Sequence, residues 1–144
     1  MVSSPRARAN EVLMNGSLTQ IPGLAASGKS LLANVQAGSL DCVNAVTAQG
    51  HWMAPCDCTV VGATARVLAV MGTAAATIGA GLTSDTDSIV DDYSIGTGIA
   101  AGTVIDLPLA AGVNLNKGDV VVFQSDGGAT STGSVAMSLA VVAR

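Results

Sequence analysis

The sequence predicts an all-β fold, an antiparallel sandwich or barrel that follows an N-terminal arm. From Ser39 onward, apolar residues alternate with polar or small ones, which is the period of a half-buried strand. Turn residues, mostly glycine, interrupt the alternation about every ten residues, as in all-β domains. The stretch before Ser39 lacks this alternation. We therefore expect an arm over residues 1–38 and a domain of about eight strands over residues 39–144.

The segment Ser134–Val141 shows the alternation most clearly. Serine and alanine occupy one face, and the other face is apolar, with Val135, Met137, Leu139 and Val141. Because successive side chains of a strand point to opposite faces, we predict a strand with one face in the core.

Thr103–Leu109 is predicted to be a strand at the edge of a sheet. Pro108 has no amide hydrogen to donate to a neighbouring strand, so the strand lies at an edge or ends there. The alternation points Asp106 outward and three apolar side chains inward, those of Ile105, Leu107 and Leu109.

Six further segments have the composition of strands. The continuous apolar run Val67–Met71 has no polar face, so we expect it to be covered on both faces, which requires contact beyond the partner sheet. The six segments are Leu40–Val46, His51–Ala54, Thr59–Val70, Ala75–Gly79, Ser88–Tyr93 and Val120–Ser125.

The arm is predicted to be extended and to lie on a neighbouring subunit. Its apolar residues Leu13, Leu18, Ile21 and Leu24 do not fall on one face of a helix. Prolines and glycines interrupt any long element. The alternative is a short helix over Gly28–Gly38, with the last glycine as its C-terminal stop.

The composition favours a subunit of an assembly. Apolar residues make up 49% of the chain and aromatic residues only 2%, so the core is built from small side chains. Charged residues make up 11%, well below the usual quarter of a globular protein. A monomer of this composition leaves apolar surface exposed, and large apolar patches usually mark contacts with other proteins.

The charge is unevenly distributed. In the first forty residues Arg6, Arg8 and Lys29 outnumber Glu11, for a net charge of +2; the remainder has three basic and nine acidic residues, for a net charge of −6. An acidic body repels a phosphate backbone, so we expect no binding to nucleic acid. No run of about eighteen apolar residues occurs, so we expect no membrane segment and place the protein in the cytoplasm or in a particle assembled there.

Gly23–Ser30 matches the P-loop pattern GxxxxGK[ST]. A true P-loop has a buried strand before it, a helix after it and a parallel sheet around it. Ser17–Pro22 is a poor buried strand, and the following helix would have at most about ten residues. We therefore attribute the match to the high content of alanine, glycine and serine and expect no bound nucleotide or other cofactor.

Cys42, His51, Cys56 and Cys58 are the ligand types of a tetrahedral zinc site. Their spacing lacks the CxxC-type knuckle of zinc ribbons and fingers. We expect free thiols that behave as small apolar side chains, with a disulfide and a zinc site as alternatives.

The sequence predicts neither catalytic residues nor metal ligands. The acidic pairs at 85–87 and 91–92 are candidate calcium ligands, but no D-x-D-x-D-G loop is present, and we expect them in solvated turns. The single histidine, His51, belongs to no recognisable catalytic arrangement. We expect Trp52 to pack where the arm meets the body and to anchor a contact.

Residues 54–142 resemble the small β-sandwich proteins that decorate or cement the heads of tailed bacteriophages. The resemblance covers about 60% of the chain and implies a jelly-roll-like fold that self-associates and binds the outside of a capsid shell. It implies no catalytic residues. The similar segments are APCDCTVVGATARVLAVMGTAAATI, AAGTVIDLPLAAGVNLNKGDVVVFQSDGGAT and GSVAMSLAVVAR.

We therefore expect a structural virion protein that cements major capsid subunits on the outer surface of the capsid. Its expected partners are the major capsid protein and further copies of itself, as a homodimer or homotrimer. The alternative is a phage fibre or adhesin module that binds a host glycan, with Trp52 or Tyr93 as sugar platforms. The expected interface residues are Arg6, Arg8, Leu13, Leu18, Ile21, Leu24 and Trp52.

Overall fold

A computed structural model describes residues 31–111 and 113–144 of the chain. Over this part the chain forms nine strands and no helix, so it contains no helix that could span a membrane. The strands are β1 (Leu31–Asp41), β2 (Val46–Met53), β3 (Cys58–Ala69), β4 (Ala76–Leu82), β5 (Asp85–Ile95), β6 (Val104–Asp106), β7 (Asn114–Leu115), β8 (Val120–Ser125) and β9 (Ser134–Ala143).

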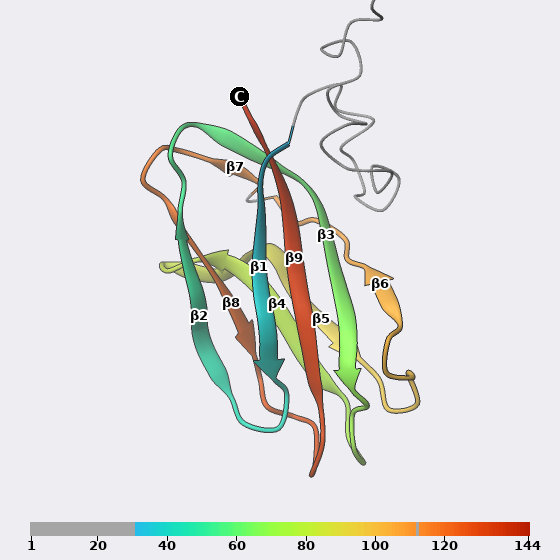
Figure 1. The fold of residues 1–144 in the computed structure, drawn as a ribbon. Helices are drawn as coiled ribbons and strands as arrows, with labels where there is room; N and C mark the ends of the chain where they lie inside the picture. Colours follow the sequence, from blue (N-terminus) through green and yellow to red (C-terminus); the bar gives the residue numbers. More distant parts are fainter. Residues whose placement is uncertain (1–30, 112) are drawn as a thin grey trace, which may run out of the picture.

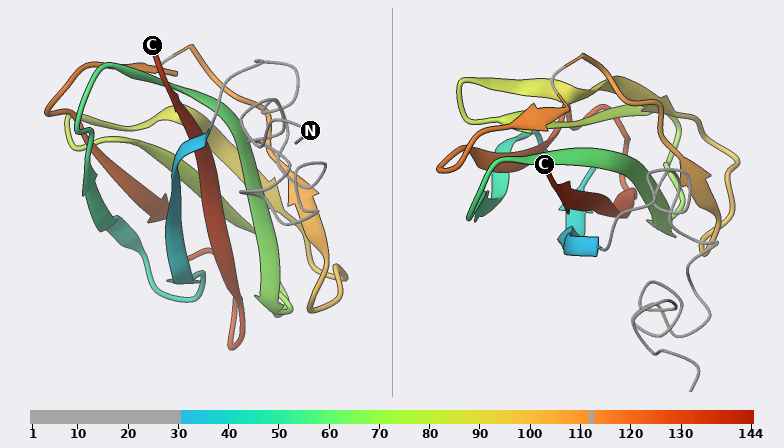
Figure 2. Two further views of the ribbon diagram at one scale, coloured as in Figure 1. Left: turned by 45° about the horizontal axis from the view of Figure 1, so that its top comes forward. Right: turned by 90° about the horizontal axis from the view of Figure 1, so that it is seen from above.

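The strands form two antiparallel sheets that pack face to face, which confirms the predicted all-β sandwich (Figures 1 and 2). The first sheet has the order β1-β9-β3-β6, with β7 also paired to β3. The second sheet has the order β2-β8-β4-β5. Every pair of neighbouring strands is antiparallel.

Most connections pass from one sheet to the other. Only the β4–β5 hairpin and the link from β6 to β7 join strands of the same sheet. Because the chain crosses between the layers at nearly every connection, the first and last described strands, β1 and β9, become neighbours.

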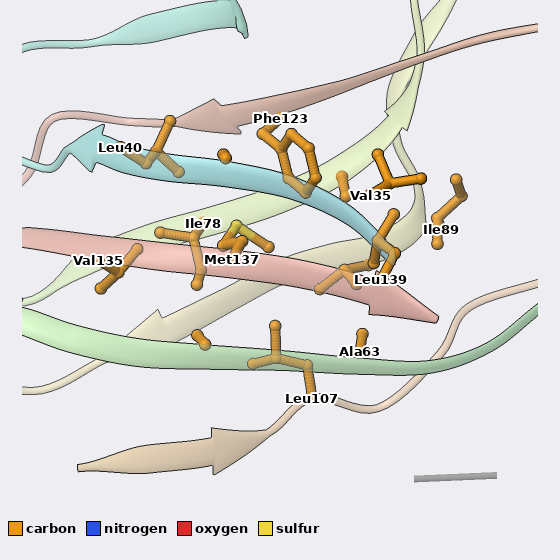
Figure 3. Packing of buried hydrophobic residues seen from close by; sticks show 14 of the residues in the cluster. Val35, Leu40, Ala63, Ile78, Ile89, Leu107, Phe123, Val135, Met137 and Leu139 are labelled. Atoms are coloured by element: carbon orange, nitrogen blue, oxygen red, sulfur yellow. The ribbon is translucent and has the colours of Figure 1, made fainter. Parts of the chain in front are cut away.

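The core between the sheets consists of aliphatic side chains around one aromatic ring. Phe123 of β8 is the largest fully buried side chain, and Figure 3 shows it among residues of the first sheet, including Leu40 and Leu139. The predicted inward face of β9 is confirmed, since Val135, Met137, Leu139 and Val141 are all buried. The fold therefore rests on small side chains, as the composition indicated.

The predictions for the edge strand are confirmed in part. β6 pairs with β3 alone and is an edge strand, and Leu107 beyond it is buried. The inward position predicted for Leu109 is wrong, because its side chain is 36% exposed. The strand ends at Asp106, before Pro108, so the alternation no longer holds at Leu109.

The sandwich begins earlier than the predicted boundary at residue 39. β1 starts at Leu31, so residues 31–38 belong to the first sheet and not to an arm, and the alternative helix over Gly28–Gly38 is wrong. Leu31, Ala33, Val35 and Ala37 alternate with more exposed residues, and this period-two row pairs with β9.

The turn from β4 to β5 folds so closely over β4 that only glycine fits at position 81. A Cβ atom there would lie 2.2 Å from the carbonyl oxygen of Asp85 and 2.6 Å from the amide nitrogen of Ser88. Both neighbours are backbone atoms, which cannot turn aside as a flexible side chain can. The hairpin therefore depends on the missing side chain.

We predict that Gly81→Ala lowers the free energy of unfolding by about 1–3 kcal/mol, the cost of overpacking a tight site. Urea denaturation followed by tryptophan fluorescence measures this change. Gly96→Ala is the matched control, because a Cβ atom at Gly96 would meet no atom within 4 Å. Equal stability of the two variants would contradict the proposed close packing.

Candidate functional site

Most of the expected interface residues lie outside the described part of the chain. The exception is Trp52, which lies on β2 opposite Val121, half-buried and packed against the core. Its role as a contact anchor stays a prediction. The residues outside the described part are Arg6, Arg8, Leu13, Leu18, Ile21 and Leu24.

The P-loop match at Gly23–Ser30 also lies outside the described residues, but the segment directly after it is described. Leu31 begins β1, a strand of an antiparallel sheet. A P-loop places its lysine and serine at the N-terminus of a helix, inside a parallel sheet. The residues after Ser30 therefore do not have the structure that phosphate binding by this motif requires.

The three cysteines are free thiols and do not form one cluster with His51. The Cys42 amide donates a 3.0 Å hydrogen bond to the carbonyl of Gly133, just before β9 begins, whereas Cys58 pairs with Ala143 at the other end of β9. Ten residues of strand separate these two ends by about 30 Å. Cys42 therefore cannot share a zinc ion with Cys58.

The thiols differ in their exposure. Cys42 and Cys58 are buried, and burial raises the pKa of both thiols, while Cys56 is half-buried in the turn before β3. A thiol reacts through its thiolate, so a raised pKa and lack of access both slow the reaction.

We predict that one thiol of the native protein, that of Cys56, reacts quickly with a disulfide reagent such as DTNB, and that the other two react only on unfolding. Absorbance gives the number of thiols released, and mass spectrometry of the peptides identifies them. Cys56→Ser should abolish the fast phase. Two fast thiols in the native protein would contradict this assignment.

Three carboxylates gather on β5, at the edge of the second sheet. Asp87, Asp91 and Asp92 each offer an oxygen, and these atoms lie within 4.8 Å of one another. Among the described residues this is the one group of three or more possible metal-ligating side chains. The expectation that these aspartates lie in turns is wrong, because β5 spans Asp85–Ile95. The sequence predicted only the Ser88–Tyr93 part of this strand, because the aspartates at 85 and 87 are atypical of a strand.

These three residues, which we call the acidic cluster, are partly or fully exposed, and their negative charges repel one another. A hydrogen bond with Asp85, then burial and the charges of the neighbouring carboxylates, raises the pKa of Asp87. The side chains border an open groove of about 580 Å³ whose far wall is formed by Ala110 and Ala111. The amide of Gln124 donates a 3.0 Å hydrogen bond to Asp92. The cluster thus makes this edge strongly negative.

Asp126 fastens the loop after β8 to the start of β4. Its carboxylate accepts hydrogen bonds from the amides of Thr77 (2.9 Å) and Gly128 (2.8 Å), and its own amide donates to the carbonyl of Thr77. Burial acts to raise the pKa of Asp126, but these hydrogen bonds outweigh it, so the pKa lies below its usual range.

We predict that Asp126→Ala lowers the free energy of unfolding at pH 7 by about 1 kcal/mol, the net value of a solvent-screened hydrogen-bonded turn. A carboxylate whose pKa is lowered by folding contributes stability above its unfolded pKa of about 3.9 and loses it as the pH falls further. Urea titrations at pH 7 and pH 3 should show the difference from wild type shrinking. Asp91→Ala is the control, and a difference independent of pH would contradict the role given to these hydrogen bonds.

The turn Lys117-Gly118-Asp119, between β7 and β8, has a structural role. Gly118 has a φ of +92°, a backbone conformation that residues with a side chain rarely adopt. The carboxylate of Asp119 accepts a 2.8 Å hydrogen bond from the amide of Asn116, and the amide of Gly118 donates to the carbonyl of Ala54. The turn therefore ties β8 to the loop between β2 and β3.

The outward-facing side of the first sheet, which we call the outer face, has almost no charge. Ala65 and Val67 of β3 point into the core, so their neighbours along the strand point outward. The outer face holds one basic residue, Arg66, and two acidic residues, Asp106 and, at the end of β1, Asp41. Its other members are small, amide or apolar: Asn34, Gln36, Thr64, Leu68, Val104, Ala136 and Ser138.

Two apolar side chains remain exposed on the outer face. Val104 is 62% exposed and Leu68 is 39% exposed. The sequence predicted that the run Val67–Met71 is covered on both faces, and in this single chain it is not. The sequence missed Arg66 as a possible contact residue because an arginine in a strand has no distinctive pattern.

The described residues thus contain two contrasting surfaces, a negative edge at β5 and a nearly uncharged outer face on the first sheet. No protein-family model matches the chain, and neither a characterised protein nor a solved structure matches it.

Proposed function

We propose that the protein is a structural, non-enzymatic subunit that binds the outer surface of a tailed-phage capsid and cements major capsid subunits together. The observation that supports this proposal is the outer face of the first sheet. It exposes Leu68 and Val104 on a surface with only three charged residues, Arg66, Asp106 and Asp41. Exposed apolar surface of this kind is typical of proteins that act through contacts.

The strand order supports the jelly-roll-like interpretation. The two sheets have the strand orders β1-β9-β3-β6 and β2-β8-β4-β5, with the short β7 added to the first, and most connections cross between the layers. Jelly rolls of eight strands in two sheets occur in viral capsid and lectin domains. This topology supports the same two functions that we inferred from the sequence, a capsid protein and a glycan-binding module.

A cement protein acts through many repeated contacts with the shell, so no single contact has to be strong. An interface of about 800 Å² per partner is enough for a stable contact, and contacts repeated over a shell add their effects. In this proposal residues 1–30 anchor the subunit to the shell through Arg6, Arg8 and the apolar residues among them. The sandwich then bridges neighbouring positions, and the protein belongs to the virion after assembly in the host cytoplasm.

The aromatic side chains do not favour the glycan-binding alternative. Sugars usually stack on exposed aromatic rings. Trp52 and Tyr93 are half-buried and packed against the core, and Phe123 is fully buried. These three are all the aromatic residues of the chain.

We predict that the full-length protein sediments with capsid shells at a fixed stoichiometry and raises their melting temperature. A variant with Leu13, Leu18, Ile21 and Leu24 changed to serine should lose at least tenfold in shell affinity, since it loses the apolar area that anchors it. Met53→Ser, which changes an exposed apolar residue of β2, is the control and should bind as the wild type does.

Two outcomes would contradict the proposal. Wild-type protein that does not sediment with shells of its own particle would exclude cementing. Full affinity of the serine variant would exclude the anchoring role of residues 1–30. Binding in a glycan array, with no effect on shells, would support the adhesin alternative.

A further inference from the structure

We propose that the outer face of the first sheet packs against the same face of a second copy, about a two-fold axis, to form a dimer of four stacked sheets. This inference rests on the proposed function, for which the sequence analysis expects a homodimer or homotrimer, and it identifies the surface through which two copies associate. Three properties of the face support it: its shape, its charge and its area.

The first property is shape. The middle of the face is formed by β9, which contributes the short side chains of Ala136 and Ser138. Thr64 of β3 lies beside Ser138, and their hydroxyl groups are 3.3 Å apart, so this polar pair is satisfied within the sheet. Short side chains in the middle allow a second sheet to approach to the usual spacing of about 10 Å.

The second property is charge. Arg66 lies opposite Val104, and Asp106 lies opposite Thr64, so these two charged residues are diagonal neighbours on adjacent strands. Neither side chain has a hydrogen-bond or ion-pair partner among the described residues. A two-fold interface brings each residue of one copy against its counterpart in the other, so that Arg66 of each copy can face Asp106 of the second copy. The face is therefore complementary in charge to itself.

The third property is area. Three strands at a spacing of about 4.8 Å with about eight residues at 3.3 Å each, together with the three residues of β6, give a flat surface of roughly 430 Å². The relief of the side chains adds to this flat area. Stable interfaces bury from about 600 Å² of accessible surface per partner upward, so the face has the size of a small interface.

A second copy fits this face better than the N-terminal segment of the same chain. Arg6, Arg8 and Lys29 outnumber Glu11 in residues 1–30, so that segment has a net positive charge. It is drawn more strongly to the carboxylates of β5 than to a nearly uncharged face. A nearly uncharged, apolar face is best covered by another face of the same kind.

The first experiment reverses the charges in the full-length protein and measures the dimer dissociation constant by sedimentation equilibrium. Arg66→Asp and Asp106→Arg each replace two attractive pairs by two repulsive ones, and each should weaken the dimer at least tenfold. The double variant R66D/D106R restores opposite charges across the axis and should return to within about threefold of wild type. Urea denaturation of each variant checks that the monomer is folded.

The second experiment changes an apolar contact. Val104→Lys places a charge within the proposed interface and should leave the protein monomeric at concentrations where wild type is dimeric. Met53→Lys is the matched control, because Met53 is 64% exposed, as Val104 is 62% exposed, but it ends β2 in the other sheet. This control should stay dimeric.

The results separate this inference from shell binding, because dimerisation is measured with no shell present. The inference would be overturned by a wild-type protein that is monomeric at 100-fold the concentration at which it binds shells. Single charge reversals that leave the dissociation constant unchanged, or a double variant no better than the singles, would also overturn it. A dimer that does not bind shells would overturn only the proposed cement function.

Discussion

The pairing of β9 with β1 on one side and β3 on the other is the interaction on which the rest of the structure depends. Leu139 of β9 lies between Val35 and Ala63 of these neighbours, and all three side chains are buried. Because β1 and β9 are the first and last described strands, this pairing joins segments about one hundred residues apart. The first sheet therefore forms only when nearly the whole described chain is in place, and the second sheet then has a face to pack against (Figure 3).

The same pairing determines the character of the outer face. The inward row of β9 contains Val135, Met137, Leu139 and Val141, so the outward row in the middle of the sheet contains the small residues Ala136 and Ser138. Larger side chains appear only toward the edge of the sheet, at Leu68 and Val104. A core of small aliphatic side chains and a flat, uncharged outer face are thus two consequences of one alternating pattern.

Strong alternation made some elements predictable from the sequence. β8 has the predicted bounds Val120–Ser125, and β9 has the predicted inward face. β1 was missed because its inward row contains two alanines, which give a weak hydrophobic period, and because its pairing with a distant strand has no local sign. The approach of Asp87, Asp91 and Asp92 was missed because the predicted strand began only at Ser88, which left Asp87 in a turn, in line with the low strand propensity of aspartate. The outer face could not be predicted, because its members depend on the order of the strands in the sheet, which no pattern in the sequence specifies.

The distribution of charge gives the two surfaces different consequences for assembly. Exposed sheet edges and exposed apolar faces both tend to bind other chains. Proteins limit such binding by placing charged side chains of like sign on these surfaces. A hydrogen bond with Asp85 and burial are the main causes of the raised pKa of Asp87, and the negative charges of the neighbouring carboxylates of β5 add to it. A second copy at that edge would add as many negative charges again, so self-association there is opposed. On the outer face Arg66 and Asp106 cancel, and the same repulsion is absent. The chain thus places its few charges so that one surface of the described residues resists a second copy and the other accepts it.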